Sequence, residues 1–195
     1  MRHTISQRVV IAGVLALAAS TLAHAQTPVA TTDDPFAKRR WHFETGFHTA
    51  FESWNYNVSH EELYGLTEGL TYGLKDGLVL TATQHIYYVS QRANDSWLLG
   101  LTAGFRGRVY RQGRSIVYLD GSVGISDAAI AVPPRGTRFN YLVTGGGGVL
   151  VRLSSRVHAL AALQWIHVSN NSLKGPGRNP DTEAVGGRLG LVIGL

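Results

Sequence analysis

A hydroxyl, an imidazole and a carboxylate occur close together near the end of the sequence. They belong to His167 and Ser169, which are separated by one residue, and to Glu183, which follows the stretch Asn179-Pro180-Asp181-Thr182. A carboxylate that orients an imidazole, which in turn removes the proton of a hydroxyl, converts serine into a nucleophile. An activated serine of this kind cleaves esters. The three residues therefore predict acyl-ester hydrolysis, provided that the fold brings them together.

The elements that must position these residues are β-strands. From Trp41 onward, apolar residues alternate with polar or small ones at a period of two, which is the pattern of a strand with two different faces. The runs are much longer than the roughly 5–6 residues of strands in soluble proteins, and they are long enough for a tilted strand that crosses a bilayer, which needs about 9–11. We expect strands over residues 41–54, 61–74, 77–91, 97–111, 114–127, 137–153, 156–169 and 182–195. The sequence thus predicts an all-β protein, an eight-stranded antiparallel transmembrane β-barrel of the outer membrane.

The connections between the expected strands alternate in length, as they do in outer-membrane barrels. Lys75-Asp76-Gly77, Arg111-Gln112-Gly113 and Ser154-Ser155 are expected to be tight turns. The other connections are longer and more polar, and lie near residues 55–60, 92–96, 128–136 and 170–181. Short turns face the periplasm and long loops face outward in such barrels, so the site near residue 170 is expected at the outer rim.

The alternation also predicts which face carries each side chain. His167 and Ser169 share the phase of Leu163 and Trp165, and Glu183 shares the phase of Val185, so all three are expected to point outward, toward lipid. Histidines in the opposite phase or in loops are expected in the lumen or at the rim; they are His42, His48, His60, His85 and His158. One residue does not follow the pattern: Glu68 has the phase of the apolar residues of its strand, and the pattern offers no reason for it.

The N-terminus predicts export. Arg2 and Arg8 precede the short apolar run 9–19, and Ala23-His24-Ala25 has the form of a signal-peptidase site, so residues 1–25 are expected to be a signal peptide. Residues 26–40 are expected to be a flexible lead-in, and residues 41–195 the barrel domain.

Removal of the signal peptide leaves a formal charge of +3, because it contains two arginines and no acidic residue. The chain has no cysteine, which excludes disulfides and thiolate chemistry, and no basic groove that would favour nucleic acid.

Three segments resemble a known family, the PagL-type lipid A 3-O-deacylases, also called acyloxyacyl hydrolases. The segments are Gly136-Thr137-Arg138-Phe139-Asn140, His167-Val168-Ser169-Asn170, and Asn179-Pro180 followed by Glu183. The resemblance implies an outer-membrane barrel enzyme without a metal or other cofactor, which removes the 3-O-linked hydroxyacyl chain of lipid A. It implies that Ser169 is the nucleophile, His167 the base, Glu183 the orienting acid and Asn170 an oxyanion donor, with Asp181 as an alternative third member.

The substrate would be lipid A of lipopolysaccharide in the outer leaflet, and two cations of the last loop, Lys174 and Arg178, are candidates to hold its phosphates. We also consider a homodimer.

The main alternative is a non-enzymatic eight-stranded barrel with a role in adhesion or envelope integrity. A soluble lipocalin-like binder would also contain alternating strands, and a metal-dependent phospholipase is a further alternative, although the sequence has no dense carboxylate loop.

Overall fold

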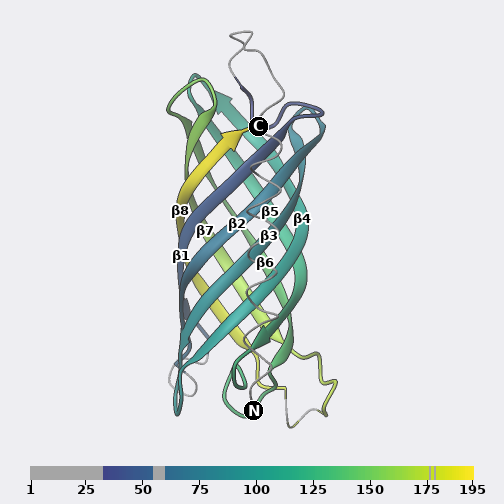
Figure 1. Cartoon of the computed structure of the whole chain (residues 1–195), viewed down its shortest axis with the longest axis vertical. Helices are drawn as coiled ribbons and strands as arrows, with labels where there is room; N and C mark the ends of the chain where they lie inside the picture. Colours follow the sequence, from purple (N-terminus) through teal and green to yellow (C-terminus); the bar gives the residue numbers. More distant parts are fainter. Residues whose placement is uncertain (1–32, 55–59, 176, 178) are drawn as a thin grey trace.

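The computed structural model describes residues 33–54, 60–175, 177 and 179–195, and in them the chain forms a closed barrel of eight antiparallel strands (Figure 1). Each strand pairs with its neighbours in sequence, and the pairing of the first strand with the last closes the barrel. The predicted fold is confirmed. The strands are β1 (Trp41–Glu52), β2 (Glu62–Lys75), β3 (Leu78–Ser90), β4 (Ser96–Gln112), β5 (Ser115–Ala128), β6 (Phe139–Arg152), β7 (Val157–Ser169) and β8 (Thr182–Gly194).

The three expected tight turns connect β2 to β3, β4 to β5 and β6 to β7, at the end of the barrel where the C-terminus lies (Figure 1). Gly77 and Gly113 have φ angles of 86° and 55° in the first two of these turns. A left-handed backbone carries no steric penalty at glycine, which explains the residue at both positions. The longer connections, including the β7–β8 loop, lie at the opposite end.

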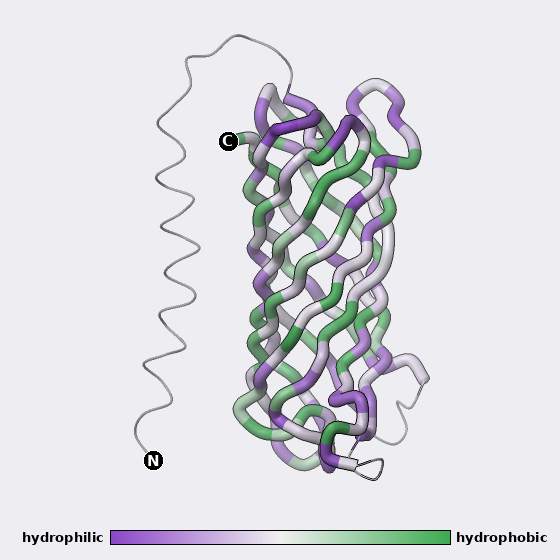
Figure 2. The backbone as a smooth tube through the Cα atoms, turned by 90° about the vertical axis from the view of Figure 1, so that its right-hand side faces the viewer, coloured by the Kyte–Doolittle hydropathy of each residue, from purple (hydrophilic) through white to green (hydrophobic). Residues whose placement is uncertain are grey.

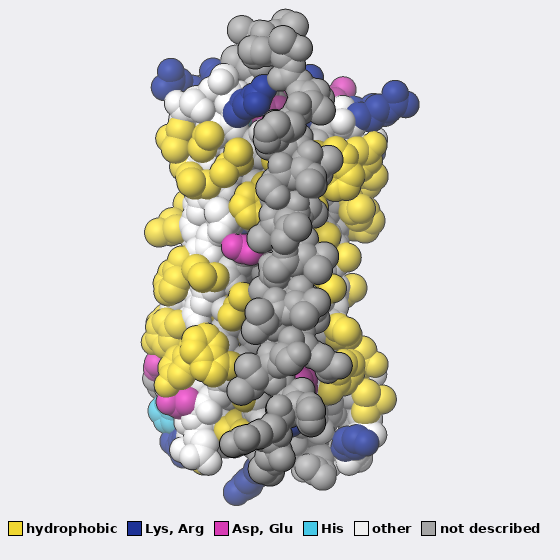
Figure 3. Space-filling model, in the orientation of Figure 1, with side chains coloured by type: hydrophobic (Ala, Val, Ile, Leu, Met, Phe, Trp, Pro, Cys, Tyr) yellow, Lys and Arg dark blue, Asp and Glu magenta, His cyan; other side chains and the backbone are white. Residues whose placement is uncertain are grey.

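Apolar side chains cover the outside of the barrel. Leu163, Leu189 and Val123 are 72%, 68% and 65% exposed, values that would be unfavourable in water for so many large side chains. Figure 3 shows apolar side chains over the middle of the barrel and basic side chains at its two ends, and the hydropathy of the tube in Figure 2 alternates along the strands. An apolar band bounded by polar ends is the surface of a barrel that contacts lipid. Among the described residues, no helix has the length and apolarity of a membrane span.

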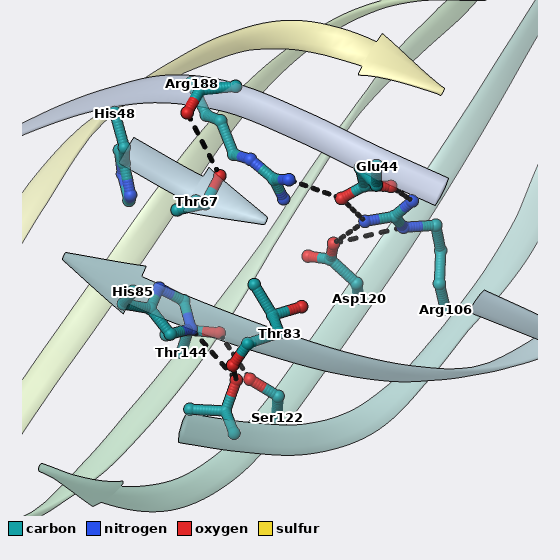
Figure 4. Close-up of polar contacts among 12 residues, drawn as sticks. Glu44, His48, Thr67, Thr83, His85, Arg106, Asp120, Ser122, Thr144 and Arg188 are labelled. Carbon is teal, nitrogen blue, oxygen red and sulfur yellow. Dashed lines mark hydrogen bonds and ion pairs between the residues drawn. The ribbon is translucent and has the colours of Figure 1, made fainter. Parts of the chain in front are cut away.

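The middle of the lumen is filled by a network of charged side chains that come from distant parts of the sequence (Figure 4). Glu44 accepts hydrogen bonds from the guanidinium groups of Arg106, at 2.5 and 3.1 Å, and of Arg188. Arg106 also contacts Asp120 at 3.2 Å and stacks over the ring of Tyr118. Two carboxylates and two guanidinium groups balance each other, so this enclosed network carries no net charge. We call these four residues, Glu44, Arg106, Asp120 and Arg188, the lumen network.

Apolar clusters occupy the remaining lumen, which is therefore less uniformly polar than alternation alone indicates. One cluster includes Leu98, Leu142, Ile166 and Val168, from the halves of the strands that lead to the long loops. The other includes Ile116, Leu150, Leu160 and Val192, from the halves that lead to the tight turns. The barrel interior is thus packed like a protein core, and a small cavity of about 20 Å³ lies beside the lumen network.

Residues 33–40 lie against the tight-turn end of the barrel. Phe36 is buried in the second apolar cluster, the carboxylate of Asp33 contacts the imidazole of His42 at 2.7 Å, and Asp34 contacts Arg108 at 3.0 Å. This described part of the expected lead-in therefore belongs to the packed structure. Residues 26–32 and the predicted signal peptide, residues 1–25, lie outside the described residues.

Candidate functional site

The structure brings His167, Ser169 and Glu183 together at the long-loop end of β7 and β8. His167 and Glu183 are direct partners in the antiparallel register, so their side chains leave the same face side by side. The imidazole Nδ1 lies 2.7 Å from Glu183 Oε1, and Nε2 lies 2.8 Å from Ser169 Oγ. A continuous hydrogen-bonded chain thus runs from hydroxyl to imidazole to carboxylate.

The hydrogen-bond partners determine which nitrogen of a neutral His167 carries the proton. An ionised carboxylate can only accept hydrogen bonds, so Nδ1 donates to Glu183. Nε2 then accepts the hydroxyl proton of Ser169. This tautomer is the one in which an imidazole can act as a base toward a serine hydroxyl.

Trp165 is a fourth member of this cluster, and the sequence analysis did not single it out. Its indole N–H donates to Glu183 Oε2, and its ring stacks on that of His167 with an interplanar angle of 23°. Both carboxylate oxygens of Glu183 are therefore engaged. The strand register could have indicated this contact. Trp165 has the same outward phase as His167, and it pairs with Val185, which is two residues from Glu183.

The strands hold these side chains on a rigid wall. The inward neighbours of the site residues, Ile166, Val168 and Ala184, are fully buried in the apolar cluster behind the site. The start of β8 is fixed further by the inward carboxylate of Glu52, which accepts the backbone N–H of Glu183 at 2.6 Å. Packing of the inward side chains fixes the backbone of these strands, and the fixed backbone in turn positions the outward residues.

Asn170 follows the serine and connects three segments of the outer rim. Its side-chain amide donates to Thr137 Oγ1 at 3.0 Å, and its backbone N–H donates to Asn179 Oδ1 at 2.9 Å. Thr137 and Asn179 therefore hold Asn170 in place, and both occur in the segments that resemble the deacylase family. Asn171 and Ser172 continue the chain with φ angles of 50° and 60°, a left-handed turn that is uncommon for residues other than glycine.

A pocket of about 370 Å³ opens beside Asn170, between the β5–β6 and β7–β8 loops. Phe139 and Leu173 give it apolar walls, and Arg138 and Lys174 contribute cations. Arg138 donates to the carbonyl of Ala128 at 2.7 Å and also pairs with Asp127. Of the two cations that the sequence predicts as phosphate contacts, Lys174 lines the pocket, and Arg178 lies outside the described residues.

Asp181 lies near the same imidazole. One ligand atom each from His167, Asp181 and Glu183 lie within 4.8 Å of one another, a spacing that would allow them to hold a cation together. The hydrogen bond to Nδ1 is made by Glu183.

Comparison with protein-family models finds no match, and comparison with curated protein sequences finds none either. Solved structures do match. Neisserial surface protein A (NspA) has a TM-score of 0.60 at 13% identity and covers 80% of this chain and 97% of its own. OprG of Pseudomonas aeruginosa has a TM-score of 0.53 at 12% identity, with coverage of 84% and 99%. The outer membrane enzyme PagL has a TM-score of 0.52 at 13% identity, with coverage of 77% and 99%. The chain therefore has the fold of the eight-stranded outer-membrane β-barrels, which enzymes and non-enzymatic proteins share.

Proposed function

We propose that this protein is an outer-membrane ester hydrolase that removes the 3-O-linked hydroxyacyl chain of lipid A. The observation that carries the proposal is the hydrogen-bonded chain Ser169–His167–Glu183 on the outward face of the barrel rim. A barrel that serves only as a scaffold has no need of an aligned nucleophile, base and acid. The resemblance of the surrounding segments to lipid A deacylases supports the substrate.

The proposed reaction is acyl transfer to water through an acyl-serine. His167 Nε2 takes the proton of Ser169 as Oγ attacks the ester carbonyl, and the resulting imidazolium is stabilised by Glu183. The tetrahedral intermediate collapses, the C–O bond to the sugar breaks, and His167 returns the proton to the departing sugar oxygen. Water then attacks the acyl-serine with His167 again as base, which releases the fatty acid and restores Ser169.

Asn170 is the proposed oxyanion donor, together with backbone N–H groups of the left-handed turn at Asn171 and Ser172. Two features support this assignment: Asn170 is adjacent to the nucleophile in the chain, and it lines the pocket next to the site. Donors aimed at the developing oxyanion usually make the largest single contribution to acyl-transfer catalysis. Lys174 is the proposed contact for a lipid A phosphate, and Arg178 is proposed for the same role.

The position of the site supports a lipid substrate. Polar groups on the outer face of a barrel cost little near the interface and more toward the bilayer centre. The site lies at the long-loop end of β7, beside the apolar band that includes Leu163 and Leu189. An acyl chain in the outer leaflet can therefore lie along the barrel wall while its ester approaches Ser169.

The proposal is tested with the full chain folded in lipid vesicles that contain lipid A, with the released hydroxy fatty acid measured by mass spectrometry. Wild type and Ser90→Ala, which removes an outward hydroxyl at the same end of β3, are expected to release it. Ser169→Ala is expected to release none above background. Equal release by wild type and Ser169→Ala would exclude the nucleophile, and activity that is lost on chelation and restored by a divalent cation would favour the cation site of His167, Asp181 and Glu183.

The second candidate is a non-enzymatic barrel with a role in adhesion or envelope integrity. The similarity to NspA, whose TM-score is higher than that of PagL, supports it on the fold alone. A wild-type barrel that is fully folded and releases no fatty acid from lipid A would favour this candidate.

A further inference from the structure

The tight-turn end of the barrel carries a surplus of positive charge. Nine basic and three acidic residues lie in the segments that form this end, which are residues 33–41, 75–78, 108–115 and 152–157. Five basic and seven acidic residues lie in the segments of the opposite end, which are residues 52–62, 91–96, 127–138 and 170–183. The charge of the molecule is therefore divided unequally between its two ends.

The acidic residues of the tight-turn end neutralise only part of this charge. Asp34 pairs with Arg108 at 3.0 Å and with Arg111 at 2.6 Å. The other seven basic side chains form no ion pair with a described acidic residue, and all but Arg152 are exposed. We call these seven residues the cationic ring: Lys38, Arg39, Arg40, Lys75, Arg114, Arg152 and Arg156.

The cationic ring follows the circumference of the barrel. Its members lie beside the start of β1, the end of β2, the start of β5, the end of β6 and the start of β7, which occupy opposite sides of the closed sheet. Figure 3 shows basic side chains that project sideways from this end, beyond the apolar band. A soluble partner could cover one side or the end face of the barrel, whereas the lipid around a barrel reaches every side. The arrangement therefore favours lipid.

The cationic ring also lies at the depth of lipid headgroups. Trp41 is 46% exposed on the outer wall, and Arg40 directly precedes it. Its cross-strand partner is Tyr72, after which the chain continues through the outward Leu74 to Lys75. Interfacial aromatic residues mark the headgroup level, and the long side chains of Lys and Arg bring their charge to the phosphates there.

We propose that the cationic ring binds the phosphate groups of anionic glycerophospholipids in one leaflet of the membrane. Short turns face the periplasm in outer-membrane barrels, so this leaflet is the inner one. Cations near a membrane surface are attracted to lipids that carry a net negative charge, and a zwitterionic headgroup carries none. The opposite end has more acidic than basic residues and gives no comparable preference. This lipid contact is independent of the proposed ester hydrolysis, whose site lies at that opposite end.

The first test measures which lipid surrounds each end of the folded barrel in vesicles of phosphatidylcholine and phosphatidylglycerol. The chain has four tryptophans, of which Trp41 lies at the tight-turn end and Trp97 at the long-loop end. Two single-tryptophan proteins keep one or the other, with phenylalanine at the remaining three positions. Fluorescence quenching by brominated phosphatidylglycerol is compared with quenching by brominated phosphatidylcholine.

Phosphatidylglycerol is expected to be enriched about threefold or more around Trp41, and not around Trp97. Equal enrichment at the two ends would overturn the assignment to the cationic ring. The absence of any preference at Trp41 would overturn lipid binding, and an acidic periplasmic protein or polymer would then be the better partner.

The second test removes charge from the cationic ring in the protein that keeps Trp41. Arg40→Gln combined with Lys75→Gln is expected to lower the enrichment by about half or more. Arg92→Gln combined with Arg135→Gln is the matched control, because it removes two exposed cations from the long connections, and it is expected to change nothing at Trp41. Equal losses from the two pairs would contradict the proposal.

The third measurement needs no substitution in the cationic ring and therefore does not depend on the folding of its variants. The protein that keeps Trp41 is measured again at about 1 M salt, where charges are screened beyond about 3 Å. The enrichment of phosphatidylglycerol is expected to disappear. Enrichment that persists at high salt would show that charge is not the basis of recognition and would overturn the proposal.

Discussion

Two carboxylates on the two faces of the same barrel wall have opposite surroundings. Glu44 points into the lumen, is almost fully buried, and is held by two guanidinium groups that are themselves enclosed. Glu183 points outward, is 23% exposed, and is held by an imidazole and an indole. Because Glu44 is buried and paired with guanidinium groups that stay charged, its role is to stabilise the interior of the barrel. Glu183 instead contacts the imidazole of His167, which in turn contacts the hydroxyl of Ser169.

The comparison separates two uses of hydrogen bonding. In the lumen network every charge is matched by an opposite charge, and the benefit lies in a filled and specific interior. At the rim, the chain of hydrogen bonds ends in the hydroxyl group of Ser169. A serine hydroxyl that loses its proton to an imidazole can attack a carbonyl carbon. Removal of a lumen charge should therefore change stability and leave chemistry intact, whereas removal of a rim group should do the reverse.

The largest expected effect is that of Glu183→Gln on catalysis. An amide can donate to Nδ1 and favour the wrong tautomer of His167, so under the proposed function kcat for lipid A deacylation should fall by roughly 10⁴-fold, the loss known for the corresponding change in a Ser–His–Asp triad. Urea unfolding in vesicles should give nearly the wild-type free energy. A variant with full activity would show that this carboxylate does not orient the imidazole.

Glu44→Gln should have the largest effect on stability. It leaves two buried guanidinium groups without their shared anion, so the free energy of unfolding should fall by about 3–5 kcal/mol. Activity per folded molecule should stay unchanged. Asp127→Asn is the matched control, because it breaks an exposed pair with Arg138 and should cost less than about 1 kcal/mol. Equal losses in the two variants would contradict the structural role of the lumen network.

Trp165→Phe should have an intermediate effect. It keeps an aromatic ring beside His167 but removes the indole hydrogen bond to Glu183, which is worth about 1.5 kcal/mol when the acceptor is charged. We therefore expect kcat to fall by about tenfold. Trp97→Phe, at an exposed outward position of β4, should leave kcat unchanged, and a similar loss in both variants would assign the effect to interfacial anchoring.

Asp181→Asn should have the smallest effect, less than about threefold on kcat, because a neighbouring charge near the surface interacts weakly through water. The measurement is deacylation with and without added divalent cation. A loss comparable to that of Glu183→Gln would indicate that Asp181 takes part directly, either with the imidazole or in a cation site.

Much of the fold could be predicted because it depends on a local signal. A period of two, sustained over long runs, indicates strands and assigns each side chain to a face, and the turn residues mark the strand ends. The same signal placed His167, Ser169 and Glu183 outward, and it flagged Glu68 as an exception. Residues 33–40 carry no such period, which is why their contacts with the barrel end were not anticipated.

The sequence by itself determined the strands, their faces and the outward direction of the three site residues, because alternation is a property of neighbouring residues. Only the tertiary structure decided which groups meet. It opposed His167 to Glu183 and placed Asp181 to the side, brought the indole of Trp165 onto the same carboxylate, and joined Glu44 to Arg106 and Arg188 across the lumen. These contacts depend on strand register and barrel closure, which bring together residues far apart in the chain. The alternation of neighbouring residues does not reveal which distant residues are paired.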